Sequence, residues 1–229
     1  MNDITIIYIT ANKINDFFAE NIRKELIKAA AGIPIISVSK KPLNFGVKNL
    51  CFPGKTCIYN EYKETYLGVR EAKTKYVAIA EDDSLYTPAH FAHIPTPETF
   101  DYNIACWGIF TWVRPPTYNL KYRRNHNALV CERDLYIKAM EERLSKYPNE
   151  ENSPPKFAEP GRYDHSLGVP IHKIGEFTSN PPIVRFSHTD DCYGFKAMGT
   201  LKGMADIKAF DIPYWGRADK LLEKIYGIS

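Results

Sequence analysis

Short apolar runs alternate with amphipathic stretches through the first third of the chain. Residues 4–9 are apolar and mostly β-branched, as in a buried parallel strand. From Ile14 to Ala31, apolar residues recur every three or four positions, which predicts a helix with one buried face, stopped by Gly32. A second apolar run at 33–38 predicts another strand, and this order implies a right-handed crossover and a parallel pair.

The same alternation continues to residue 83. Residues 42–59 contain Pro42, Gly46 and Pro53 and read as a loop. Asn60 is placed to cap a second helix that ends near Lys73. A third buried strand follows at 76–80. We therefore expect an α/β fold with a mostly parallel sheet flanked by helices.

The second half of the chain is less regular. Its aromatic and β-branched segment 102–113 predicts one strand. Further expected elements are a short strand at 127–130, a helix at 133–146, a loop at 149–160, a turn or helix at 163–167, a strand at 183–186 and a C-terminal helix carrying Leu221, Leu222 and Ile225. We expect a single domain over 1–229, with a more regular half at 1–110 and a less regular half at 111–229.

Composition narrows the class of protein without identifying it. With 229 residues, 44% hydrophobic and 25% charged, the chain has the profile of one globular domain. Its net charge of +3 permits an anionic ligand but does not by itself favour nucleic acid. Five cysteines without a CxxC pair indicate neither a zinc site nor a disulfide framework. No run has the length of a membrane span and no signal peptide is evident, so we expect a cytoplasmic protein.

Three carboxylates follow the strand at 76–80 directly: Glu81, Asp82 and Asp83. Ligands bind at the carboxyl ends of strands in open α/β sheets. Adjacent acids repel one another unless a cation compensates, and oxygen ligands suit a hard divalent ion that also holds phosphates. The alternative is a helix N-terminus, because Thr87 and Pro88 look like a cap followed by the first helical residue.

The stretch 68–83, Gly68-Val69-Arg70-Glu71-Ala72 followed by an apolar strand and acids, resembles the segment that precedes the DxD-type motif of GT-A glycosyltransferases. The resemblance covers about the first 110 residues, and it implies a nucleotide-sugar-binding half at 1–110 and an acceptor-binding half at 111–229. It implies a GT-A fold and transfer of a sugar from a nucleotide-sugar donor, with a UDP-sugar expected. Glu81 stands where the family motif has its first Asp, so the match is incomplete.

The resemblance also implies roles for particular positions. Glu81 and Asp82 would face the nucleotide ribose or the donor sugar, and Asp83 would bind Mn²⁺ or Mg²⁺, with His188 as a second metal ligand. The remaining nucleotide-sugar-binding positions are Thr10, Asn12 and Ser39 at the first two strand ends and Arg70 near the nucleotide.

The resemblance further implies a general base on the acceptor face of an inverting enzyme. Asp164 follows Gly161 at the start of an expected short helix and is the candidate, with Glu159 in reserve. A retaining mechanism without such a base is the competing account.

Two other classes of function stay open at this stage. A nucleotidyltransferase has a similar sheet but usually carries a Gly-rich loop after the first strand, and residues 10–13 contain no Gly. The other class is a non-catalytic nucleotide-sugar-binding module. The expected acceptor is a glycan or, given the basic stretch 121–124, a hydroxymethylated base in phage-type DNA.

Overall fold

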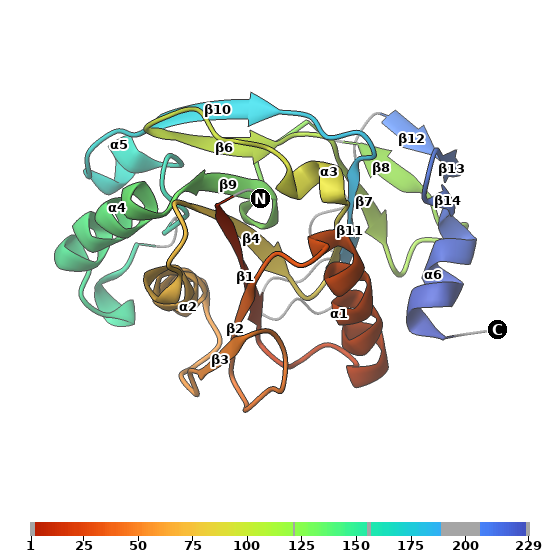
Figure 1. The fold of residues 1–229 in the computed structure, drawn as a ribbon, viewed down its shortest axis with the longest axis horizontal. Helices are drawn as coiled ribbons and strands as arrows, with labels where there is room; N and C mark the ends of the chain where they lie inside the picture. The colour runs from red at the N-terminus through yellow and green to blue at the C-terminus, as the bar shows by residue number, and fades with distance from the viewer. Residues whose placement is uncertain (1–2, 121, 155–156, 189–206, 228–229) are drawn as a thin grey trace.

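A seven-stranded sheet forms the centre of the computed structural model, which describes residues 3–120, 122–154, 157–188 and 207–227 (Figure 1). All its strands run parallel except β9, which is antiparallel to both of its neighbours. In sheet order the strands are β10 (Lys173–Phe177), β6 (Thr99–Asn103), β9 (Leu129–Glu132), β4 (Tyr76–Glu81), β1 (Ile4–Thr10), β2 (Ile35–Ser39) and β3 (Lys48–Cys51). The expected mostly parallel α/β sheet is confirmed.

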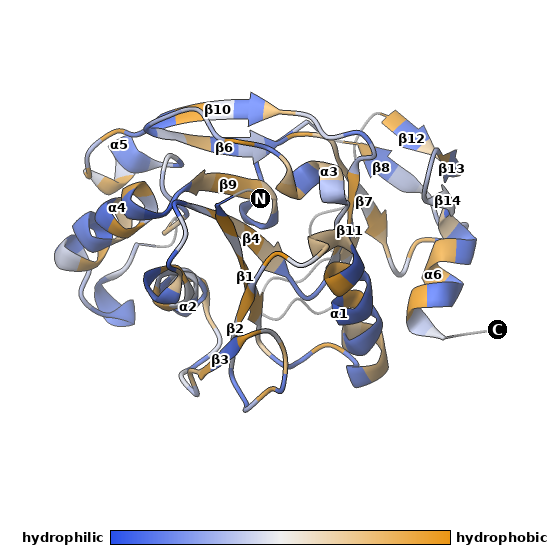
Figure 2. Cartoon of the chain, in the orientation of Figure 1, coloured by the Kyte–Doolittle hydropathy of each residue, from blue (hydrophilic) through white to orange (hydrophobic). Residues whose placement is uncertain are grey.

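The mainly apolar strands β1 and β4 lie side by side in the middle of this sheet. Ile7 pairs with Ile79 in register, and both are fully buried. Figure 2 shows the central strands as predominantly apolar, as expected for strands covered on both faces. The expected placement of both strands in one sheet, with the first two strands of the chain adjacent, is also confirmed.

Helices cover both faces of the central sheet (Figure 1). One apolar core joins the sheet to α2 (Ile58–Glu71) and α4 (Arg133–Lys146). The core on the opposite face includes Leu26 and Ala29 of α1 (Asp16–Ala30) and Phe91 of α3 (Pro88–Phe91). The C-terminal α6 (Ala218–Tyr226) packs on α1, and the expected apolar residues Leu221, Leu222 and Ile225 are buried there.

A second, five-stranded sheet is built mainly from the later part of the chain. Its strands, in order, are β12 (Ile207–Ala209), β8 (Tyr118–Leu120), β7 (Cys106–Phe110), β11 (Ile183–Ser187) and β5 (Ser84–Leu85). A separate two-stranded ribbon joins β13 (Asp211–Ile212) to β14 (Gly216–Arg217). Because β5 directly follows the acids of β4, the two larger sheets meet beside those acids.

The prediction of a single strand at 102–113 is wrong, because this segment is divided between the two sheets. Asn103 ends β6, and its side-chain Oδ1 accepts hydrogen bonds from the backbone N–H groups of Ala105 and Ser179. These bonds turn the chain out of the central sheet, and β7 begins at Cys106 in the second sheet. The aromatic and β-branched pattern runs through both strands and does not mark the break.

Several element boundaries also differ from those expected. The loop expected at 42–59 contains the edge strand β3. The first helix is capped by Asn15, whose Oδ1 accepts from the N–H groups of Phe17 and Phe18. The second helix starts at Ile58, and Asn60 lies inside it with its side chain bonded to the Lys55 carbonyl. Phe17 and Ile27 belong to the expected buried face of α1 but are exposed.

Within the described ranges, no helix is both long and apolar enough to span a membrane. Four of the five cysteines lie in these ranges and carry free thiols, namely Cys51, Cys57, Cys106 and Cys131.

Candidate functional site

The three acids after β4 do not point to one place. Side chains alternate along a strand, so Glu81 continues the face of Val77 and Ile79, which packs against α2 and α4. Asp82 continues the opposite face and meets Thr10 of β1. Asp83 lies beyond the strand and pairs with Arg185 of β11. The three consecutive acids therefore belong to three different clusters of side chains.

Asp82, Thr10, Ser39 and Asn12 form the first cluster, at the carboxyl ends of β1, β2 and β4. The Thr10 hydroxyl donates to Asp82 Oδ2 and accepts from the backbone N–H of Asn12 at 3.0 Å. Thr10 is also the register partner of Ser39. Asn12 has a positive φ of 52°, and its Oδ1 accepts from the N–H of Lys41 at 3.0 Å. The structure thus brings four of the predicted nucleotide-binding residues together.

Burial dominates the electrostatics of this cluster. Asp82 is buried, which raises its pKa to about 7 even though the Thr10 hydroxyl and the backbone oppose the shift. The charges of Asp83 and Glu81 add to the increase. A cationic or hydrogen-bonding ligand at this edge would therefore meet a carboxyl group that takes or gives up a proton near neutral pH.

Asp83 belongs to a second cluster with Arg185. Its Oδ2 lies 3.2 Å from Arg185 Nε, and its Oδ1 accepts a hydrogen bond from Ser84 at 2.8 Å. The charge of Asp83 raises the pKa of Arg185 above its ordinary value. The Phe186 N–H donates to the Asp83 carbonyl, so β11 passes directly alongside this acid.

His188 lies two residues beyond that backbone contact. Its Nδ1 is 3.0 Å from the Tyr226 hydroxyl, and its ring packs edge-on against Phe18. Burial lowers the pKa of His188, while the negative charge of Asp83 acts in the opposite direction. The structure therefore places His188 and Asp83 in the same region, and the imidazole contacts Tyr226.

The Asp83 carboxylate already has two polar partners. Arg185 already supplies the positive charge beside the carboxylate, and Ser84 occupies the other oxygen. A metal at this point would have to share Asp83 with the guanidinium or displace it. His188 Nε2 has no hydrogen-bond partner in the described part of the chain, which leaves one imidazole nitrogen for a ligand.

A third cluster forms around Glu81 on the α2 face. Glu61 of α2 and His126 of the short 3₁₀ helix η1 (His126–Ala128) converge on Glu81, and one ligand atom from each lies within 4.8 Å of the other two. Burial would lower the pKa of His126, but the two carboxylates outweigh it and raise the pKa to about 10. Burial in turn raises the pKa of Glu61 to about 6.

Asp164, the predicted general base, lies in a different environment. It begins α5 (Asp164–Leu167), and its carboxylate pairs with the fully buried Arg143 and accepts from the N–H of His172 at 2.9 Å. His172 directly precedes β10, which runs in the same direction as β4. Asp164 is thus beside the amino end of β10, whereas Asp82 and Asp83 follow the carboxyl end of β4.

The contacts of Asp164 are those of a structural carboxylate. Burial alone would raise its pKa, but hydrogen bonds from His172 and the charge of Arg143 hold the pKa below its usual value. The reserve candidate Glu159 is also buried, where it accepts from the Tyr62 hydroxyl at 2.7 Å and pairs with Arg162 at 3.2 Å. Neither carboxylate makes a contact with the acids of β4 among the described residues.

Arg70 is not brought to the strand ends either. It occupies the last turn of α2, and its guanidinium lies over the Tyr66 ring at 5.6 Å. The helix runs back from the carboxyl to the amino end of the sheet, so about 18 Å of helix separates Arg70 from the first turn. The predicted contact of Arg70 with a nucleotide at the strand ends therefore has no support in this geometry.

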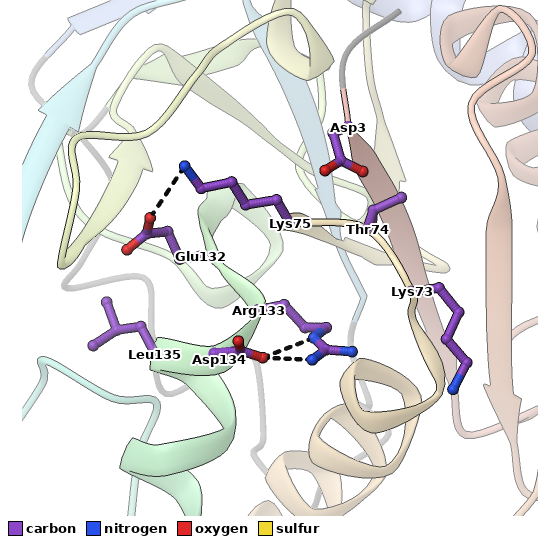
Figure 3. Close-up of a pocket in the computed structure, with 8 residues that line it drawn as sticks. All are labelled: Asp3, Lys73, Thr74, Lys75, Glu132, Arg133, Asp134 and Leu135. Carbon is purple, nitrogen blue, oxygen red and sulfur yellow. Dashed lines mark hydrogen bonds and ion pairs between the residues drawn. The ribbon is translucent and has the colours of Figure 1, made fainter.

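A polar pocket of about 480 Å³ lies at the amino ends of β1 and β4, opposite the acids. Figure 3 shows its lining, in which Lys75 faces Glu132 and Arg133 pairs with Asp134. The negative charges of Glu132 and Asp134 largely offset the positive charges of Lys75 and Arg133. Since ligands of open α/β sheets bind at the carboxyl ends, we do not place the functional site there.

Sequence reasoning missed the partners of the acids: Glu61, His126 and Arg185. Glu61 is one polar position of the expected second helix, and His126 follows the basic stretch 121–124. Arg185 interrupts the apolar strand 183–186, and that interruption was the one available signal. An arginine inside a short strand beside predicted ligand residues is unusual enough to mark a charge partner.

The sequence matches no known protein-family model, and no curated protein sequence is similar to it. Among solved structures, a glycosyltransferase involved in the glycosylation of the major capsid of PBCV-1 is similar over 80% of this chain and 92% of that chain, at 12% identity and a TM-score of 0.46. The bifunctional IspDF from Campylobacter jejuni is similar over 88% of this chain and 54% of that chain, at 8% identity and a TM-score of 0.39. Likeness at this level assigns no function.

Proposed function

We propose that this protein transfers a sugar from a nucleotide-sugar donor, with a UDP-sugar as the expected donor, to an acceptor hydroxyl. The observation that supports the proposal most is the cluster of Thr10, Ser39 and Asp82 on three neighbouring parallel strands. Hydroxyl and carboxylate groups at such strand ends can hydrogen-bond a ribose and a base. The resemblance of residues 68–83 to GT-A glycosyltransferases agrees with this location.

The donor diphosphate leaves with two negative phosphates, and a positive charge must stabilise it as the glycosidic bond breaks. Arg185 is a suitable group, because it is held beside Asp83 next to the strand ends. Mn²⁺ or Mg²⁺ at Asp83 and His188 stays a prediction, and a bound metal would supply the same charge as a Lewis acid. Asp164 as the inverting base also stays a prediction, as do the glycan and modified-DNA acceptors.

Calorimetric titration with UDP-sugars tests the donor site. Asp82→Asn keeps an oxygen that can accept from Thr10 but removes the carboxylate, and we expect it to weaken donor binding by at least about tenfold. Asp134→Asn, at the opposite end of the sheet, is the matched control and should bind the donor normally. Equal affinity in both variants would contradict a donor site at Asp82.

The alternatives differ in their products. A nucleotidyltransferase releases pyrophosphate from a nucleoside triphosphate, whereas a glycosyltransferase releases a nucleoside diphosphate from a nucleotide sugar. A non-catalytic module binds the donor and releases neither product. Measuring both products with the same preparation separates the three functions.

A further inference from the structure

We propose that Glu61, Glu81 and His126 form a binding site for a transition-type divalent cation such as Zn²⁺ or Mn²⁺, distinct from the position beside Asp83. The inference concerns metal binding alone and does not depend on glycosyl transfer. It starts from three side chains delivered by three separate elements, α2, β4 and η1, to one partly enclosed point.

Two of the three distances within this cluster match those between ligands of one cation. His126 Nδ1 lies 3.3 Å from Glu61 Oε1 and 3.5 Å from Glu81 Oε1. Nitrogen and oxygen ligands sit about 2.0–2.2 Å from Zn²⁺, so two ligands at tetrahedral or octahedral angles are about 3.0–3.5 Å apart. A cation in front of Nδ1 can therefore reach both carboxylates without a large movement of any side chain.

The imidazole is buried with both carboxylates on the same side of its ring. Its side chain is only 5% exposed, Nδ1 forms ion pairs with both carboxylates, and Nε2 has no hydrogen-bond partner among the residues that the structure describes. Both carboxylate oxygens approach the same nitrogen, Nδ1, and a single N–H cannot be directed at two acceptors equally well. A divalent cation that takes the place of the Nδ1 proton would contact both carboxylates at once.

The backbone around the cluster is held in place. The Tyr86 hydroxyl accepts from the Glu81 N–H at 3.1 Å and donates to the Asn127 carbonyl at 2.9 Å. It therefore ties the end of β4 to η1 next to His126. The Tyr62 ring packs edge-on against the imidazole at 4.9 Å, which limits its rotation. A ligand set on fixed supports binds metal with little reorganisation.

The donor set indicates the class of metal. One imidazole nitrogen with two carboxylate oxygens suits Zn²⁺, Mn²⁺ or Fe²⁺ better than Mg²⁺ or Ca²⁺, which prefer oxygen alone. Three protein ligands also leave coordination positions open for water or a substrate oxygen. The Glu61 and Glu81 side chains are 12% and 16% exposed, so the open side of the site is reachable from solvent.

The test is direct metal binding to the full chain after treatment with a chelator. Titration with Zn²⁺ and Mn²⁺, followed by elemental analysis of gel-filtered protein, should find one equivalent that depends on Glu61 and His126, with Mg²⁺ competing weakly for it. Glu61→Gln and His126→Gln should each weaken this binding by at least about tenfold. Glu71→Gln on the same helix and Asp83→Asn should leave the affinity unchanged.

Pulsed electron paramagnetic resonance of the Mn²⁺-loaded wild type gives a readout that does not require the Glu variant to fold. The spectrum should show coupling to one imidazole nitrogen, which His126→Gln removes and His188→Gln retains. The proposal is overturned if the wild type binds neither metal, if Glu61→Gln and His126→Gln bind as well as the wild type, or if the nitrogen coupling follows His188.

Discussion

The Thr10 hydroxyl donates a hydrogen bond to the Asp82 carboxylate across the carboxyl ends of two neighbouring parallel strands. The two residues are far apart in the chain, and the central sheet alone brings them together. Both side chains are buried, so the bond forms in an environment that strengthens it. This pair marks the edge of the sheet at which we place the nucleotide-sugar donor.

Arg185 is the positively charged residue that we expect to contact the donor diphosphate, and substituting it tests this role. Arg185→Gln removes the guanidinium beside Asp83 and should weaken UDP-sugar binding by at least about tenfold, because charge-assisted hydrogen bonds to phosphate are lost. Arg217→Gln, which removes an exposed arginine paired with Asp219, is the control and should bind normally. Calorimetry with and without Mn²⁺ makes the comparison. Unchanged donor affinity in Arg185→Gln would exclude this role.

Asp164→Asn distinguishes a structural carboxylate from a general base. The substitution leaves the buried Arg143 without its charged partner, and we expect the free energy of unfolding to fall by about 3 kcal/mol, as when a buried ion pair is broken. Urea unfolding measures this loss, and Asp211→Asn at an exposed position should show little. A general base instead predicts normal stability and a turnover number reduced by at least about 10²-fold.

The ionisation of Glu64 should make the free energy of unfolding depend on pH. Burial raises the pKa of Glu64 from 4.5 to about 7, although the ion pair with Lys40 opposes the shift. The folded state therefore holds this proton more tightly than the unfolded state does. Its contribution to the free energy of unfolding is complete below about pH 4.5 and is lost as the pH rises toward 7.

The comparison with Glu64→Gln isolates that contribution. The wild type should lose stability relative to Glu64→Gln as the pH rises from about 5 to about 8, because glutamine does not ionise. Urea unfolding of both proteins across this range measures the difference. A difference that stays constant with pH, or one that grows in favour of the wild type, would contradict the assignment.

Gly68 allows α2 to approach the sheet closely. A Cβ added there would lie 2.6 Å from Cγ2 of Ile7 and 2.9 Å from Cγ2 of Val38. Alanine gains up to about 1 kcal/mol in helix propensity but costs about 1–3 kcal/mol in overpacking, so we expect Gly68→Ala to be destabilised overall. Thermal unfolding should show a lower Tm than the wild type, whereas Ser145→Ala, exposed on α4, should not.

The elements with strong periodicity could be predicted from the sequence. The expected strands at 4–9, 76–80 and 183–186 and the helix at 133–146 appear at or within two residues of their expected positions. Each of these elements has a clear apolar pattern and ends at a recognisable change in the sequence. The edge strand β3 was missed because it has only two apolar residues in four, and because the surrounding loop residues obscured it.

The candidate site could be predicted only in part. The strand ends identified Thr10, Ser39 and Asp82 correctly as neighbours, since parallel strands align their carboxyl ends. Local pattern could not show that Glu81, Asp82 and Asp83 face three different partners. Those partners, Arg185 and His126 among them, come from distant segments whose approach is determined by tertiary packing. Asp164 was predicted as the general base from the family resemblance alone, and no contact of its side chain requires that role.

The most direct test of the proposed function is a thermal-shift panel of nucleotide sugars, with and without Mn²⁺, followed by mass spectrometry of the products. A ligand that binds the folded state raises the Tm by mass action. We predict that one class of nucleotide sugar, with UDP-sugars expected, raises the Tm of the wild type and releases the nucleoside diphosphate, and that Asp82→Asn loses both effects. A wild-type protein that neither gains stability from any nucleotide sugar nor releases a nucleoside diphosphate would contradict the account.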